Sequence, residues 1–283
     1  MPVSGSTQLV KWLCTIATLV GVCGVGCLFI YRNVPPEPEI GNLPLSAWLA
    51  KYAEGEPGAE TAIRRLGTNA IPCLMRLVRS QDSKGKRVLL KLIGGQSSVQ
   101  LNSALTRQLL GWKGFEALGV VGDSAVPELA TFLDNTNTSR IGAMALAGVG
   151  SDAALNRLSR ALSSENEMIR RDVAIAFGYL RDFQPWILNK LSNSLDDPDA
   201  GVRYAVTVSI GRLNADPDSV VPALLRAIQD TNGGVRYAAV EGLAKIDPKS
   251  QRAVEALRNA TKDPNAAVRE QAQSCLRHKG TGQ

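Results

Sequence analysis

The feature that most constrains the fold of this chain is a repeat with a period of 33 residues. The segments DPDAGVRYAV, DTNGGVRYAAV and DPNAAVREQA align without a gap and begin at Asp197, Asp230 and Asp263. The segment SENEMIRRDVA, which begins at Ser164, stands one period earlier. A unit this short cannot bury its apolar face alone, so neighbouring units must stack against one another. The repeat therefore predicts an extended array of stacked units.

Each unit is predicted to hold two helices joined by turns, without any strand. Helical i, i+3, i+4, i+7, i+8 spacing is shown by Val202, Ala205, Val206, Ser209 and Ile210. The first helix of each unit repeats a core position at Leu155, Leu188, Val221 and Val254. Residue types that accept backbone N–H bonds precede each second helix, which predicts N-caps at Asn166, Asp199, Asn232 and Asn265. About seven helix pairs are expected between residues 70 and 279, preceded by short helices near 45–53 and 59–67. The stretch 80–111 fits the register worst.

The N-terminal part of the chain contains an apolar segment of bilayer length. Twenty residues without a charge lie between Lys11 and Arg32, with Trp12 and Tyr31 at their ends. At about 1.5 Å per residue they span roughly 30 Å, the thickness of the hydrocarbon core, and aromatic residues are enriched at membrane interfaces. The segment 12–31 is therefore predicted to be a transmembrane helix in contact with the lipid bilayer. A cleaved signal peptide and lipid attachment at Cys27 are the alternatives.

The segment that follows is rich in proline and predicts a semi-rigid spacer. A short tail before the membrane segment and a large domain after it favour a single-pass signal anchor, with the repeats outside the cytoplasm. In chain order, the predicted parts are a tail (1–11), the transmembrane helix (12–31), the Pro-rich linker (32–44), divergent helices and repeats (45–110), regular repeats (111–279) and a tail (280–283).

Charge is distributed unevenly along the chain. The net charge is +6, yet residues 111–283 hold twenty Lys/Arg and twenty Asp/Glu. This balance argues against nucleic acid as a partner, because such surfaces are strongly basic. The local excess of positive charge lies at Arg79, Lys84, Lys86, Arg87 and Lys91. It is either a solvated face or a surface that contacts anionic lipid headgroups.

The repeats resemble the HEAT-repeat family in its short form, called PBS-lyase HEAT-like. The family pattern places a proline in the first helix, an aspartate in the turn and an arginine early in the second helix. This pattern is matched by Pro222, Asp230 and Arg236, by Pro127, Asp134 and Arg140, and by Pro185, Asp197 and Arg203. The resemblance covers residues 59–279 and implies a right-handed α-solenoid whose second helices line the concave face. The units are shorter than the 40–47 residues of the long form.

Stacking at a fixed period brings the repeated charged residues into register. The arginines Arg170, Arg203, Arg236 and Arg269 are expected to bond the turn aspartates Asp197, Asp230 and Asp263 of the same or adjacent units. The result is either a structural ladder or an anion-binding stripe, which the aspartates would neutralise.

The residues directly after the ladder arginines form a candidate interaction surface. They are Arg171, Tyr204, Tyr237 and Glu270, and tyrosine and arginine are favoured as interface anchors. Together with the anchor and spacer, they predict a membrane-anchored scaffold that binds a protein or peptide partner.

Enzymatic activity is not expected. The family includes phycobilin lyases and di-iron deoxyhypusine hydroxylases, and the hydroxylases bind iron through His-Glu pairs. This chain has one histidine, His278, and no His-Glu pair. We therefore expect no cofactor, no metal and no catalytic residue; a lyase-type enzyme and an anionic-lipid binder are the alternative functions.

Overall fold

The computed structural model describes residues 36–82, 103–213, 215–245 and 250–280, with side chains described as far as residue 277. Contacts divide the chain into residues Met1–Pro38 and Glu39–Gln283, and every described helix and strand lies in the second unit. The predicted tails and transmembrane helix lie outside the described residues, apart from Gly280. Among the described residues, no helix is both long enough and apolar enough to cross a membrane.

A short hairpin precedes the helices. Strands β1 (Glu39–Ile40) and β2 (Leu43–Pro44) pair antiparallel, with Ile40 opposite Leu43. The two turn residues, Gly41 and Asn42, both have positive φ, as a tight hairpin turn requires. The Trp48 Nε1–H donates to the Ile40 carbonyl at 3.1 Å and fixes the hairpin to the first helix. The end of the predicted linker is thus folded, a result that proline content alone did not indicate.

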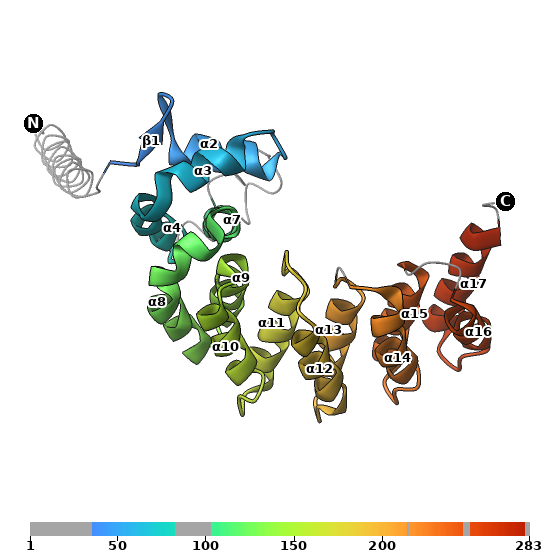
Figure 1. Ribbon diagram of the computed structural model, residues 1–283. Coiled ribbons are helices and arrows are strands. Elements are labelled where there is room, and N and C mark those ends of the chain that lie inside the picture. The colour runs from blue at the N-terminus through green and yellow to red at the C-terminus, as the bar shows by residue number, and fades with distance from the viewer. Residues whose placement is uncertain (1–35, 83–102, 214, 246–249, 281–283) are drawn as a thin grey trace, which may run out of the picture. The chain divides into compact units, whose positions relative to one another are not determined.

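The rest of the unit is helical, as predicted (Figure 1). Two short helices come first, α2 (Leu45–Ala53) and α3 (Ala59–Leu66), followed by the turn η1 (Gly67–Ala70). Helices α4 (Ile71–Val78) and α7 (Ala104–Leu118) flank residues 83–102, and the turn η2 (Gly119–Ala125) follows α7. The expectation about the irregular stretch 80–111 therefore falls largely outside the described residues.

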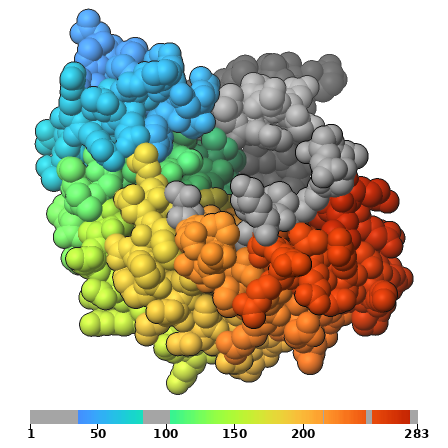
Figure 2. Space-filling model, turned by 45° about the vertical axis from the view of Figure 1, so that its right-hand side comes forward, coloured from blue at the N-terminus to red at the C-terminus, as the bar shows by residue number. Residues whose placement is uncertain are grey.

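Five helix pairs follow in the described residues from Val126 onward. They are α8 (Val126–Thr131) with η3 (Phe132–Asp134) and α9 (Ser139–Val149), α10 (Asp152–Ala161) with α11 (Glu167–Phe177), α12 (Pro185–Asn193) with η4 (Ser194–Asp196) and α13 (Ala200–Ile210), α14 (Pro217–Ala227) with α15 (Gly233–Lys245), and α16 (Gln251–Ala260) with α17 (Ala266–Gly280). Figure 2 shows the units following one another as zones from green to red.

The predicted N-caps begin the second helices. The Asn166 side chain accepts the Met168 N–H at 2.9 Å, and Asp199 accepts the Val202 N–H at 2.9 Å. Asn232 and Asn265 cap α15 and α17 in the same way. Each side chain satisfies backbone donors that the first turn of a helix leaves without a partner.

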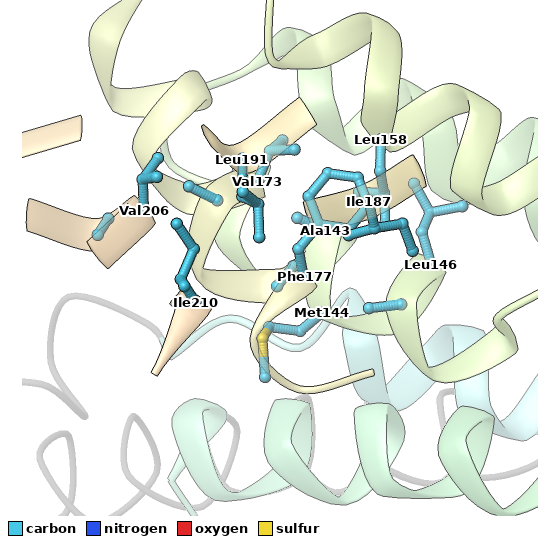
Figure 3. Packing of buried hydrophobic residues seen from close by; sticks show 14 of the residues in the cluster. Ala143, Met144, Leu146, Leu158, Val173, Phe177, Ile187, Leu191, Val206 and Ile210 are labelled. Atoms are coloured by element: carbon cyan, nitrogen blue, oxygen red, sulfur yellow. The ribbon is translucent and has the colours of Figure 1, made fainter. Parts of the chain in front are cut away.

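The core is a continuous layer between the helices of successive pairs. Figure 3 shows residues from α9 to α13 interlocking around Phe177, which is fully buried. The second helices also approach one another closely at their C-terminal ends. A Cβ added at Gly211 would lie 2.9 Å from the Gly242 Cα, a distance that real Cβ contacts do not reach. Small residues thus allow the second helices to pack closely together.

Replacing Phe177 by alanine should lower the free energy of unfolding by about 3–5 kcal/mol, because the change leaves a cavity between units. The matched control is Met168→Ala in the same helix; Met168 is 40% exposed, and the expected change is below about 0.5 kcal/mol. Denaturation of the full chain followed by circular dichroism measures both effects. Equal losses in the two variants would contradict a core located between the units.

Candidate interaction surface

In three consecutive units, one arginine joins its own turn to the turn of the next unit. The Arg203 Nε–H and Nη2–H groups donate to the two carboxylate oxygens of Asp230, at 2.7 and 3.0 Å. The Nη1–H groups of the same side chain donate to the carbonyls of Asp197 and Pro198, at 2.8 and 3.2 Å. The arginine therefore bonds the same unit through backbone carbonyls and the adjacent unit through a carboxylate.

The same contact recurs on both sides of Arg203. Arg170 holds Asp197 at 2.7 and 2.9 Å, and Arg236 holds Asp263 at 2.7 and 2.8 Å. Each carboxylate also accepts the backbone N–H two residues later in its own turn. The side chains of the three pairs are only 8–15% exposed. We call these three pairs the arginine ladder; because carboxylates already fill its arginine forks, it offers no open anion-binding stripe.

The electrostatics of the arginine ladder favour the charged forms. The hydrogen bond from Arg236 holds the pKa of Asp263 below its ordinary value. Burial acts to raise the pKa of Asp197 and Asp230, but hydrogen bonds from their arginines and turn amides outweigh it, so both pKa values are also lowered. The hydrogen bonds to the aspartates in turn raise the pKa of the three arginines.

The arginine ladder does not extend to Arg140, although the family pattern pairs it with Asp134. The Arg140 Nε–H instead donates to Asp172 Oδ1 at 3.0 Å, and the Ser139 hydroxyl donates to Asp172 Oδ2 at 2.6 Å. One period before Asp197 stands Ser164, which has no carboxylate to offer. Arg140 therefore reaches a buried aspartate within the next second helix, and the ladder begins at Arg170.

Arg269, the last predicted member, makes only half of the ladder contact. Its Nη1–H groups donate to the carbonyls of Asp263 and Pro264, at 2.7 and 2.9 Å. Among the described residues, no carboxylate makes an ion pair with it.

The residues that follow the ladder arginines lie on a more accessible part of the second helices. Tyr204 is 42% exposed, Glu270 is exposed, and Arg171 and Tyr237 are half-buried. A Cβ added at Gly234, in the next second helix, would lie 3.9 Å from the Tyr204 ring. The Tyr237 hydroxyl hydrogen-bonds Gln271 Oε1 at 3.4 Å, also in the next unit. Tyr204 and Tyr237 thus each approach the second helix of the next unit.

The structure adds residues that the sequence argument missed. Ile175 and Tyr179 stand four and eight positions after Arg171, and Val208 and Arg212 stand four and eight after Tyr204. Tyr179 is 40% exposed, meets the Trp112 ring edge-on at 5.4 Å, and has the Arg212 guanidinium 5.0 Å from its ring centre. Ile175 and Val208 follow the row members at helical i, i+4 spacing, which was the available signal, whereas Tyr179 and Arg212 lie two residues after the ends of α11 and α13. We define the second-helix surface as Arg171, Ile175, Tyr179, Tyr204, Val208, Arg212 and Tyr237.

The predicted basic segment, Arg79 to Lys91, is described by the structure only at its start. Arg79 forms an ion pair with Glu128 of α8, so its charge already has a partner. Lys84, Lys86, Arg87 and Lys91 lie outside the described residues, and contact of this segment with lipid remains a prediction. In the part of the chain that the structure describes, no group of three or more His, Cys, Asp or Glu residues could hold a metal ion.

Comparisons with known proteins agree with the helical-repeat architecture. Residues 188–277 match the model of the HEAT repeats family. No curated protein matches the chain in sequence.

A structure of the complex of CpcE and CpcF of phycocyanin lyase from Nostoc sp. PCC7120 is 23% identical, with a TM-score of 0.47, over 54% of this chain and 99% of that chain. A designed armadillo repeat protein in complex with the peptide (KR)4 is 19% identical, with a TM-score of 0.44, over 73% of this chain and 98% of that chain. Human deoxyhypusine hydroxylase in complex with glycerol is 19% identical, with a TM-score of 0.38, over 85% of this chain and 92% of that chain.

Stability should fall in acid because of the arginine ladder. The pKa of each ladder aspartate is lower in the folded chain than in the unfolded chain, so its contribution is complete above about pH 4 and is lost as pH falls through the folded pKa. Asp263→Asn should cost about 1.5–3 kcal/mol at pH 7, and its difference from the unaltered chain should shrink toward pH 3. Chemical denaturation across this pH range measures the difference.

The control for this prediction is Asp182→Asn. Asp182 is exposed, so the expected loss is below about 0.5 kcal/mol at every pH. A loss in Asp263→Asn that stays constant between pH 7 and pH 3 would show that the carboxylate charge is not what stabilises the turn.

Proposed function

We propose that this protein is a membrane-anchored, non-catalytic scaffold that binds a protein or peptide partner through the second-helix surface. The observation that carries the proposal is that the ladder arginine and the residue directly after it make different contacts. The ladder arginine bonds the turns, whereas the next residue, Arg171, Tyr204 or Tyr237, is not part of the arginine ladder. Residues that recur on one surface but make no ladder contact are candidates for binding a partner.

The chemistry of the second-helix surface suits protein contacts. Tyrosine and arginine offer large contact area together with hydrogen-bond donors, and both are enriched at energetically important interface positions. Ile175 and Val208 add apolar area between them. Arg212 lies over the Tyr179 ring. This cation–π contact orients the guanidinium but does not use its N–H donors.

The proposed partner contact requires no chemistry from this chain. The single histidine stands near the C-terminus of the sequence and is not accompanied by a His-Glu pair. A lyase-type activity is therefore not part of the proposal.

The anchor is proposed to be the segment 12–31, with residues 32–38 as spacer and the repeats outside the cytoplasm. Its support is the uncharged length and the flanking aromatic residues of the sequence. Bringing the second-helix surface near a membrane raises its effective concentration toward partners on the same membrane.

Photo-crosslinking in cells tests the interaction surface. Benzoylphenylalanine at position 204 or 237 of the full chain should yield a discrete adduct with a partner protein. The control places it at Asn189, which is exposed on the first helix α12, and should yield no such adduct. Identical adducts at positions 189 and 204 would contradict a specific role for the second-helix surface.

Membrane topology is tested by protease protection of the full chain carrying a C-terminal tag. Digestion of the tag without opening the inner membrane is the expected result, because the repeats are proposed to lie outside the cytoplasm. Protection until that membrane is lysed would place the repeats in the cytosol, and release of the chain by salt alone would exclude a spanning anchor.

A further inference from the structure

Two consecutive second helices, α11 and α13, carry the same kinds of accessible side chain in opposite order. In both, an arginine and a tyrosine stand eight residues apart with a branched apolar residue midway, but the arginine comes first in one unit and last in the next. We call these six residues the α11–α13 patch, which is part of the second-helix surface. It consists of Arg171, Ile175 and Tyr179 and, one period later, Tyr204, Val208 and Arg212.

Contacts at both ends hold the two stretches side by side, as the neighbouring helices in Figure 1 indicate. At the C-terminal end, the Arg212 guanidinium lies 5.0 Å from the centre of the Tyr179 ring. At the N-terminal end, a Cβ added at Gly201, in the first turn of α13, would lie 3.9 Å from the Arg171 Cδ. Tyr204 follows Gly201 by three residues, which is less than one helical turn. The arginines therefore stand on one diagonal of the patch and the tyrosines on the other.

Both arginines of the patch lack a carboxylate partner among the described residues. Of the acids close by, Asp199 already accepts the Val202 N–H as the cap of α13. Glu167, one turn before Arg171, is not within ion-pair distance of it. Arg212 is exposed and Arg171 is half-buried. The positive charge of the patch is thus available to a ligand, and complementary charge directs partner choice.

One donor of Arg171 is also unsatisfied. Its Nε–H is shielded from solvent and has no hydrogen-bond acceptor within the described part of the chain. A buried donor without an acceptor lowers stability. Turning this guanidinium toward an incoming carboxylate would therefore recover a hydrogen bond that the free chain does not make.

The middle of the patch is apolar. Ile175 and Val208 are half-buried, and the tyrosines beside them, Tyr179 and Tyr204, are 40% and 42% exposed. A ligand that covers this area removes apolar surface from water, which favours binding. A free anion has no apolar group to place there. The patch therefore suits a peptide that carries two acidic residues with an apolar residue between them.

The spacing of the arginines indicates the form of that peptide. The helical backbone continues through the C-cap residues Gly178 and Gly211, so the eight residues from Tyr204 to Arg212 rise about 12 Å. With about 9 Å between packed helices, the diagonal between the arginine backbones is roughly 15 Å. In an extended peptide, residues i, i+2 and i+4 face the same side, and i to i+4 spans about 13 Å. Acidic residues four apart thus match the two long arginine side chains.

We propose that the α11–α13 patch binds an extended acidic segment of a partner protein, with two carboxylates four residues apart and an apolar residue midway. One carboxylate pairs with Arg171 and the other with Arg212, and the apolar residue packs on the middle of the patch between the two tyrosines. This inference rests on the proposed function, because it gives a partner chemistry to part of the same surface.

The test measures the binding of blocked peptides with one common fluorescent label to the full chain, by fluorescence anisotropy. The peptide TDTVTDT places both aspartates and the valine on one side of an extended chain and should bind with a Kd of about 0.1–1 mM. The peptide TDTVDTT has the same composition but turns one aspartate to the opposite side, and should bind at least about fivefold more weakly. The peptides TNTVTNT and TKTVTKT, which lack acidic residues, should show no saturable binding.

Substitutions test the arginines one at a time. Arg212→Gln and Arg171→Gln should each weaken the binding of TDTVTDT at least about fivefold, with an unchanged circular dichroism spectrum. Each should also remove the preference for TDTVTDT over TDTVDTT, because only one carboxylate can then pair. The matched control is Arg157→Gln; Arg157 is exposed on the first helix α10, and the Kd should change by less than about twofold.

Three results would overturn the proposal: no saturable binding of TDTVTDT, equal binding of TDTVTDT and TDTVDTT, or equal weakening by Arg157→Gln and Arg212→Gln. Tighter binding of TKTVTKT would overturn it as well. Cross-linking at Tyr204 judges the proposed function separately. A discrete adduct there without a preference for TDTVTDT would reject only the acidic partner, whereas identical adducts at positions 189 and 204 would reject the whole surface.

Discussion

The regular part of this protein depends on one polar contact, an arginine–aspartate pair, that recurs between consecutive turns. Stacking of apolar helix faces supplies the attraction between units, but an apolar face is compatible with several relative positions of two helix pairs. A bidentate arginine–aspartate contact is compatible with few relative positions, because two N–H donors and two carboxylate oxygens must be aligned at the same time. The arginine ladder therefore sets the spacing that the buried layer then fills with residues such as Phe177 and Leu191.

The sequence allowed prediction of those features that repeat with the period. The N-caps follow from local backbone chemistry, since a side-chain oxygen needs only its own helix start to bond. The ladder pairs could also be anticipated, because the same two residue types recur at the same positions in adjacent units. Regular helices from Val126 onward follow from apolar spacing that three or more units share.

Other features could not be read from the pattern, because they depend on which atoms the fold brings together. Arg140 occupies a similar place in its helix to the ladder arginines, yet the turn it would need contains Ser164. Its partner, Asp172, stands at a position where the next two units have alanine, Ala205 and Ala238, and the last unit has Gln271. The hairpin at Glu39–Pro44 depends on two positive φ values and on a bond from Trp48. The additional members of the second-helix surface, Ile175 and Tyr179 among them, became evident only when burial separated the accessible helix stripe from the core.

The phase of the ladder contact has a further consequence for how such an array changes in length. Each arginine bonds an aspartate that lies 27 residues later, within the following unit. Duplication or deletion of one whole period inside the array leaves every internal arginine with an aspartate, and every aspartate with its turn. An insertion of another length within a helix rotates the residues that follow it and separates the arginine from its aspartate. Duplication by whole units therefore preserves the ladder contact, and added residues are accommodated only in the loops.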